Sequence, residues 1–170
     1  IIGFDGGQNL MSLYDINARV RLGARVTLRD EGRDIQVGPE VLGRVVDALG
    51  RPLDNRPMPP MADRWPLSGK EINPLARDPV ATPLDVGVRV INSCLTVGRG
   101  QRLGIIAGSG VGKSVLLSMM SRFTEADIVV VGLIGERGRE VGNFVDMVMT
   151  PDARAKTVIV AVPADRSPLL

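Results

Sequence analysis

The stretch IIAGSGVGKSVLLSMM, residues 105–120, runs from an apolar segment through a glycine-rich turn into a Lys-Ser pair and a second apolar segment. A strand that enters a helix through such a turn leaves a cluster of unpaired backbone N–H groups at the start of the helix. The helix dipole adds partial positive charge at the same point, so a phosphate group is the expected occupant. The stretch therefore predicts a phosphate-binding loop.

The motif G-x-x-x-x-G-K-[ST] fits residues 107–114 with one departure, because alanine stands at the first glycine position. In this motif the lysine, here Lys113, reaches the β- and γ-phosphates, and the hydroxyl of Ser114 is placed to ligate Mg²⁺. The alternative is a chance glycine-rich turn with an exposed lysine, but the flanking strand and helix favour nucleotide binding. The predicted nucleotide-binding residues are Ala107, Gly108, Ser109, Gly110, Val111, Gly112, Lys113, Ser114 and Val115.

The rest of the C-terminal half alternates between buried strands and amphipathic helices. Apolar segments at 101–108, 127–135 and 156–164 predict strands. Apolar residues at i, i+3, i+4 and i+7 predict two helices between them, the first with Leu116, Met119, Met120 and Phe123, the second with Val141, Phe144, Val145 and Val148. This succession predicts an α/β fold with a parallel sheet that is covered on both faces.

The N-terminal half follows a different pattern. Residues 18–29 alternate between apolar and polar side chains, and residues 40–50 predict another strand that ends near Gly50. Both favour a small antiparallel β-barrel or sandwich. Residues 51–83 contain eight of the twelve prolines, which predicts a stiff connector. We therefore expect part of a barrel domain at 1–50, the connector at 51–83, and the N-terminal half of a P-loop ATPase domain at 84–170.

Composition excludes several classes of site. The chain has no histidine and one cysteine, so disulfide frameworks and histidine metal sites are excluded. We expect Cys94 to be a small core residue, because no histidine can activate it. A net charge of +2 without charge blocks argues against a nucleic-acid arm. No apolar run reaches membrane-spanning length. The opening IIGFDGG has no initiator methionine and reads as the middle of a strand, so the chain reads as a fragment.

A second candidate functional residue is Glu136, which lies 23 residues after Lys113 and just past the predicted strand at 127–135. Ligands of parallel sheets gather at the carboxyl ends of the strands. A carboxylate there could orient and polarise an attacking water. Alternatively, Glu136 only complements the dipole of the next helix, with Arg137, Arg139 and Glu140 as solvated neighbours. The spacing alone leaves both interpretations open.

Five segments together resemble a known family. AGSGVGKS, VGLIGERGREV and GVRVINSCLTVGRGQRLGI are similar to the catalytic subunits of hexameric RecA-like ATPases related to rotary ATP synthases, and most similar to the type III export ATPases. LGRVVDALGRPLD and PADRSPLL resemble the flagellar branch most. The resemblance covers nearly the whole chain. It implies a RecA-like P-loop core preceded by a β-barrel.

The resemblance also implies an activity. It assigns catalytic roles to Lys113, Glu136 and Arg137, and it implies ATP and Mg²⁺ as cofactors. Ala107 is usual in the export branch. The implied function is ATP hydrolysis that releases, unfolds and energises export of substrate proteins. The implied assembly is a homohexamer, cytoplasmic and peripheral to the inner-membrane export gate. Expected partners are stalk and stator or regulator proteins and chaperone–substrate complexes, with no nucleic acid.

The resemblance also marks what the sequence lacks. Such ATPases need an aspartate at the end of a later apolar strand to hold Mg²⁺ (Walker B), and an arginine finger from a neighbouring subunit. Neither is found, and Asp165 is predicted to be a loop residue. Because loss of an arginine finger alone removes a factor of roughly 10³ to 10⁵ in rate, the chain as given is not expected to hydrolyse ATP appreciably.

Three alternatives remain. The nearest is the injectisome version of the same enzyme, which would have the same site chemistry. The second is an RNA translocase of the transcription-terminator type, which needs aromatic stacking residues in its barrel, whereas this segment offers only Phe4 and Tyr14. The third is a non-enzymatic nucleotide-binding or assembly module, which ATP turnover would exclude.

Overall fold

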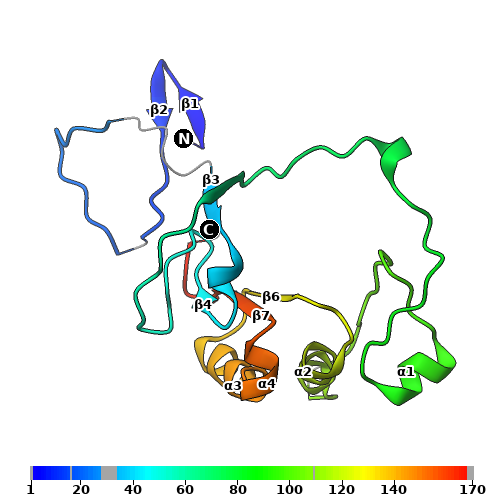
Figure 1. The fold of residues 1–170 in the computed structure, drawn as a ribbon. Helices are drawn as coiled ribbons and strands as arrows, with labels where there is room; N and C mark the ends of the chain where they lie inside the picture. The colour runs from blue at the N-terminus through cyan, green and yellow to red at the C-terminus, as the bar shows by residue number, and fades with distance from the viewer. Residues whose placement is uncertain (1, 16, 28–33, 109, 168–170) are drawn as a thin grey trace.

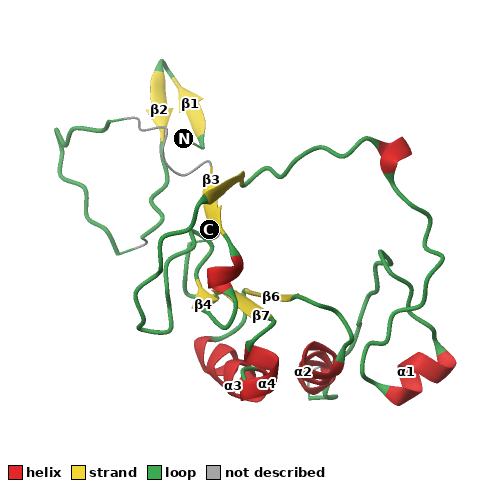
Figure 2. Cartoon of the chain, in the orientation of Figure 1, coloured by secondary structure: helices red, strands yellow, loops and turns green. Residues whose placement is uncertain are grey.

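The computed structural model describes residues 2–15, 17–27, 34–108 and 110–167 (Figure 1). Figure 2 shows the helices and strands among long irregular segments. The strands are β1 (Gly3–Asp5), β2 (Gln8–Leu10), β3 (Asp34–Val37), β4 (Val45–Val46), β5 (Asp63–Pro66), β6 (Val129–Ile134) and β7 (Thr157–Val162). The α-helices are α1 (Arg89–Cys94), α2 (Lys113–Phe123), α3 (Gly138–Val148) and α4 (Pro151–Arg154), and short 3₁₀ helices lie at Pro39–Val41 and Pro74–Ala76.

The central sheet has three parallel strands in the order β4-β7-β6. β6 and β7 pair along their full lengths, from Val129 opposite Thr157 to Ile134 opposite Val162. Parallel neighbours need a crossover connection, which α3 and α4 provide here. The α/β fold class with a parallel sheet is confirmed, as are the strands predicted around 127–135 and 156–164.

The main core lies between the sheet and α3. Side chains on one face of the sheet, including Leu133 and Ile159, pack against Phe144 and Val148 of α3. Ile159 and Val148 are completely buried. The predicted apolar face of this helix is confirmed, because Val141 and Val145 also pack against the same cluster. In Figure 1, α2, α3 and α4 lie on the same side of β6 and β7.

A smaller core cluster fixes α2. Val86, Val88 and Val97 are buried, and Leu116 and Met120 of α2 pack against them. The hydroxyl of Thr124, directly after the helix, donates a hydrogen bond to the carbonyl of Asp85. The predicted helix is therefore confirmed, although Met119 and Phe123 of its expected apolar face are more than one-third exposed.

Two features of the predicted core differ in the structure. Residues 101–108 form no strand, and Ile106 is 98% exposed. An apolar segment becomes a strand only when a neighbouring strand accepts its backbone hydrogen bonds, and the described residues offer this segment no such neighbour. The sheet is also covered on both faces only in part: Val158 and Val162 of β7 are buried on the face away from α3, whereas Val130 and Ile134 of β6 are about two-thirds exposed there.

The N-terminal region forms two antiparallel pairs, β1-β2 and β3-β5. The strand predicted from the alternating pattern of residues 18–29 is wrong over 18–27, because these residues form no strand and are exposed. Residues 28 and 29 lie outside the described residues. The strand expected within 40–50 is reduced to β4, and it pairs in parallel with β7 of the central sheet. The expected burial of Cys94 is also wrong, because this residue at the end of the short α1 is exposed.

A buried ion pair joins β4 to the connector. Arg44 donates from Nε and Nη2 to the two carboxylate oxygens of Asp54, at 2.7 and 2.9 Å. The remaining donors of Arg44 reach the carbonyls of Arg56 and Pro57. Hydrogen bonds from Arg44, with further ones from Arg56, hold the pKa of Asp54 far below its usual range. The pair fixes the start of the connector against the central sheet.

This pair predicts a pH-dependent contribution to stability. We expect Asp54→Asn to lower the free energy of unfolding at pH 7 by about 3 kcal/mol, because it leaves the buried Arg44 guanidinium without its counter-charge. The folded-state pKa of Asp54 is depressed, so the stabilisation is present above the unfolded pKa of about 4 and is lost as pH falls through the folded pKa. Chemical unfolding at several pH values should show the cost of Asp54→Asn shrinking below about pH 4.

The matched control is the double variant Arg44→Met with Asp54→Leu. Replacing both partners by apolar side chains leaves no buried charge, so the double variant should cost less than the sum of the single ones. A cost of Asp54→Asn that does not change with pH would contradict the assignment.

Candidate active site

The phosphate loop and the end of β6 line one open cavity of about 540 Å³. It lies at the N-terminus of α2, on the side toward α3. Eight of the residues that line it were predicted as site residues, and one was not. The lining residues are Ala107, Gly108, Gly110, Gly112, Lys113, Ser114, Val115, Glu136 and Glu140.

The backbone of the loop opens the start of α2 to an anion. Gly110 has φ 78° and Gly112, the residue that caps α2, has φ 94°. L-residues with a side chain rarely adopt this left-handed conformation, so glycine is required at both positions. No side chain in the described part of the chain caps this end of the helix. Its first N–H groups are therefore available to bind a ligand.

Lys113 and Glu136 face each other across the cavity. The Lys113 Nζ lies 4.0 Å from Glu136 Oε1, and the two side chains are 44% and 37% exposed. An ion pair this exposed contributes little to stability. The pair matters for its position. It places the Lys113 ammonium group and the Glu136 carboxylate, from two distant segments, beside the uncapped N–H groups of α2.

Backbone hydrogen bonds position Glu136. The N–H of Gly135 donates to the carbonyl of Val162 at 2.8 Å, and the N–H of Ala164 donates to the carbonyl of Glu136 at 2.9 Å. These two bonds continue the β6–β7 ladder beyond the last paired residues. α3 then begins at Gly138, after Arg137 as its N-cap. Glu136 is therefore held between the end of a strand and the start of a helix.

Glu140 is a site residue that the sequence analysis missed. It lies in the first turn of α3 and lines the cavity together with Glu136. From the sequence, Glu140 was expected to be a solvated neighbour of Glu136. The available signal was its place in the predicted first turn of the helix that follows Glu136, where an acidic side chain lies near the carboxyl end of the preceding strand. The cavity thus carries two carboxylates and the Ser114 hydroxyl.

Three other residues singled out from the sequence lie elsewhere. Val111 and Arg137 are exposed and do not line the cavity. Ser109 lies outside the described residues. Asp165 lies in an exposed turn after β7, as predicted. Within the described ranges, no group of three or more His, Cys, Asp or Glu side chains could hold a metal ion. No helix of the described residues is long and apolar enough to cross a membrane.

The class of protein follows from this geometry and from the family match. Residues 87–170 match the nucleotide-binding domain of the ATP synthase alpha/beta family. This range contains the phosphate loop, α2, β6, α3 and β7. Residues 87–170 are therefore similar to that nucleotide-binding domain, and the chain as a whole is similar in sequence to flagellum-specific ATP synthases and in fold to type III secretion ATPases.

The similarity to individual proteins covers the whole chain. The chain is 51% identical to the flagellum-specific ATP synthase of Salmonella typhimurium and 52% identical to that of Pseudomonas aeruginosa, over 100% of its length in each case. The chain spans 39% and 38% of the length of these two relatives.

Solved structures of export ATPases are similar in fold. A prototypical ATPase from the type III secretion system of pathogenic bacteria matches with a TM-score of 0.76 and 43% identity, over 81% of this chain and 40% of that one. The ATPase EscN of enteropathogenic E. coli, assembled with its central stalk EscO, matches with a TM-score of 0.74 and 43% identity, over 81% of this chain and 34% of that one.

Proposed function

We propose that this chain forms the phosphate-binding part of an ATPase that energises flagellar type III protein export. The observation that carries the proposal is the cavity in which free helix N–H groups, Lys113 and Glu136 come together. The flagellar assignment is supported by relatives at 51% and 52% identity that are named flagellum-specific ATP synthases.

Each residue of the cavity has a role in this proposal. The backbone N–H groups of residues 107–115 cradle the triphosphate, and Lys113 stabilises negative charge on the β- and γ-phosphates. Glu136 accepts a hydrogen bond from the attacking water and orients it for in-line attack. Arg137, at the start of α3, stabilises charge on the transferred phosphoryl group when its side chain turns toward the site. Glu140 orients polar groups around the cavity.

The oxygen atoms of the cavity fit Mg²⁺, which prefers such ligands. Ser114 is the residue that would hold the ion, and the carboxylates of Glu136 and Glu140 lie on the same cavity. When bound, Mg²⁺ neutralises charge on the β- and γ-phosphates.

The assembly is also proposed from relatives. The solved EscN structures are described as an assembled ATPase and as its complex with a central stalk. We propose that this chain belongs to a homohexamer with sites at subunit interfaces, which binds a stalk protein, stator or regulator proteins, and chaperone–substrate complexes. The proposed location is cytoplasmic, at the periphery of the inner-membrane export gate. We also propose a division into part of a barrel domain at 1–50, a connector at 51–83 and part of the ATPase domain at 84–170.

The injectisome enzyme is the second candidate. The solved structures from injectisomes favour it, at 43% identity. The flagellar relatives have higher identity, so they favour export of flagellar subunits. A transcription-terminator type RNA translocase and a non-catalytic module are less favoured. Only two aromatic residues, Phe4 and Tyr14, are found in the barrel segment, and both are exposed among its described residues.

ATP turnover by the full-length protein that carries this sequence tests the proposal. We expect phosphate release that requires Mg²⁺, stops with EDTA and returns when excess Mg²⁺ is added, because both the charge on the triphosphate and its geometry depend on the ion. Added RNA should leave the rate unchanged. Turnover that is absent with Mg²⁺ would favour the non-catalytic module, and turnover that RNA stimulates would favour the translocase.

A further inference from the structure

The backbone of Glu136 is tied to a turn that neither the motif nor the family match identifies as part of the site. Ala164 lies after β7, and its N–H donates to the carbonyl of Glu136 at 2.9 Å. Among the hydrogen bonds of the described residues, this is the one that reaches the backbone of Glu136. The neighbouring bond from Gly135 to Val162 fixes the residue before it. The position of Glu136 therefore depends on residues 162–164.

The turn that carries Ala164 is closed by its own hydrogen bond. The N–H of Arg166 donates to the carbonyl of Pro163 at 3.0 Å, so residues 163–166 form a four-residue turn with Ala164 in its second position. Ala164 and Arg166 are exposed, and Pro163 is half-buried. The N–H of Ala164 points out of this turn toward Glu136, whereas that of Arg166 closes the turn.

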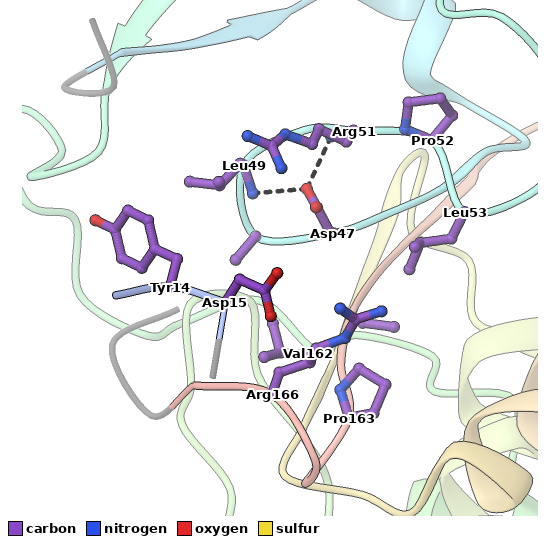
Figure 3. Close-up of a pocket in the computed structure, with 12 residues that line it drawn as sticks. Tyr14, Asp15, Asp47, Leu49, Arg51, Pro52, Leu53, Val162, Pro163 and Arg166 are labelled. Carbon is purple, nitrogen blue, oxygen red and sulfur yellow. Dashed lines mark hydrogen bonds between the residues drawn. The ribbon is translucent and has the colours of Figure 1, made fainter. Parts of the chain in front are cut away.

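Beside this turn, next to the barrel segment, the structure is hollow rather than packed. A cavity of about 410 Å³ separates Pro163 and Arg166 from the loop around Asp47 and Arg51 (Figure 3). The carboxylate of Asp47 accepts hydrogen bonds from the N–H groups of Leu49 and Arg51 within its own loop. The side of the turn that faces this cavity is therefore open. The hydrogen bond from Ala164 ties the turn to Glu136, one step beyond the bond from Gly135 to Val162.

On the basis of the function proposed above, we propose that the Ala164 amide is a positioning group for catalysis. It holds the backbone of Glu136 so that the carboxylate stays beside Lys113, 4.0 Å from Nζ. Ala164 acts through Glu136 and does not touch the nucleotide, because it does not line the phosphate cavity. Loss of this hydrogen bond should therefore lower kcat without weakening nucleotide binding. Displacements of about 1 Å in a catalytic group can lower a rate by up to 10²-fold.

Ala164→Pro tests this role in the full-length protein. Proline removes the N–H, and it is favoured at the second position of such a turn, so the turn itself should persist. We expect kcat for ATP to fall by about tenfold or more, with KM and the Kd of a labelled ATP analogue changed less than about twofold. Ala164→Ser, which keeps the N–H, is the matched control and should retain the wild-type kcat.

Two further measurements keep the test independent of folding and of the proposed function. An ester in place of the Ala164 amide removes the donor without a proline ring, and it should give the same loss of kcat even if the proline variant does not fold. In a Glu136→Gln background, Ala164→Pro should lower the residual rate no further, because the carboxylate that it positions is absent. A further drop there would indicate a general structural effect and overturn the proposal.

The two proposals fail in different ways. Wild-type kcat in both the ester and the proline variants, together with loss of turnover in Glu136→Gln, would overturn the positioning role of Ala164 alone. Normal turnover in Glu136→Gln would instead overturn the proposed catalytic function of Glu136, on which this inference rests.

Discussion

Glu136→Gln is expected to lower the rate of ATP hydrolysis by roughly 10²- to 10⁴-fold, the range that a positioned general base contributes. The amide keeps the size of the side chain but cannot accept a proton from water. Nucleotide affinity should change little, because in the proposed mode of binding the loop N–H groups and Lys113 hold the triphosphate and Glu136 lies at its end; these residues line the same cavity. Steady-state phosphate release and binding of a labelled ATP analogue measure the two quantities separately.

The matched control for this substitution is Glu125→Gln. Glu125 is an exposed glutamate that pairs with Arg99 at 3.3 Å, and it does not line the phosphate cavity. The same chemical change there should leave turnover within about twofold, because an exposed ion pair contributes little. If Glu136→Gln turned over ATP as fast as Glu125→Gln, Glu136 would have no part in the reaction.

Lys113→Ala is expected to weaken nucleotide binding by about 10- to 100-fold. Hydrogen bonds to charged groups contribute about 1.5 to 3 kcal/mol, which corresponds to this loss of affinity. The Lys113 side chain lies at the N-terminus of α2 and carries the positive charge nearest to Glu136. Without it, the loop N–H groups alone hold the phosphates. Turnover should be lost as well, since the same charge stabilises the transition state.

The matched control for this second substitution is Lys70→Ala. Lys70 lies over the ring of Trp65, 4.3 Å from its centroid, and does not line the phosphate cavity. The Lys70→Ala variant should bind nucleotide with the affinity of the wild type. Equal affinities for the Lys113 and Lys70 variants would show that the loop lysine does not contact the phosphates.

The sequence was sufficient where local pattern and burial coincide. The stripe of Val141, Phe144, Val145 and Val148 predicts a helix with one buried face, and that face packs on the sheet. The continuous apolar runs of β6 and β7 predict strands buried in a parallel sheet, and they pair in register. In each case the periodicity of a single segment determines both its structure and the face that it buries.

The sequence failed where structure depends on a distant partner. Residues 101–108 and 18–27 have strand-like patterns, but the described residues provide no strand to pair with them. β4 shows the opposite case. Its two valines were predicted to belong to a barrel strand, but they pair with Ile159 and Val160 in the central sheet. Strand pairing is a property of two segments, so one segment's pattern cannot determine it.

The site shows the same division. A phosphate-binding loop could be predicted from sequence because eight consecutive positions match one motif, and most of them line one cavity. Glu140 was missed although it lies in the first turn of the helix that directly follows Glu136. The bond between Ala164 and Glu136 had no sequence signal, because it arises from the register in which β6 and β7 pair. Residues that position a catalytic group through the backbone need the structure.

The most direct test of the account is a titration of a fluorescent ATP analogue, with Mg²⁺ present, into three forms of the full-length protein. The account predicts that the wild type and Glu136→Gln bind with equal affinity, whereas Lys113→Ala binds at least about tenfold more weakly. Inorganic triphosphate should compete with the analogue, because the loop holds the phosphates. Equal affinity in all three forms, or no binding by the wild type, would contradict the phosphate-binding role of the loop.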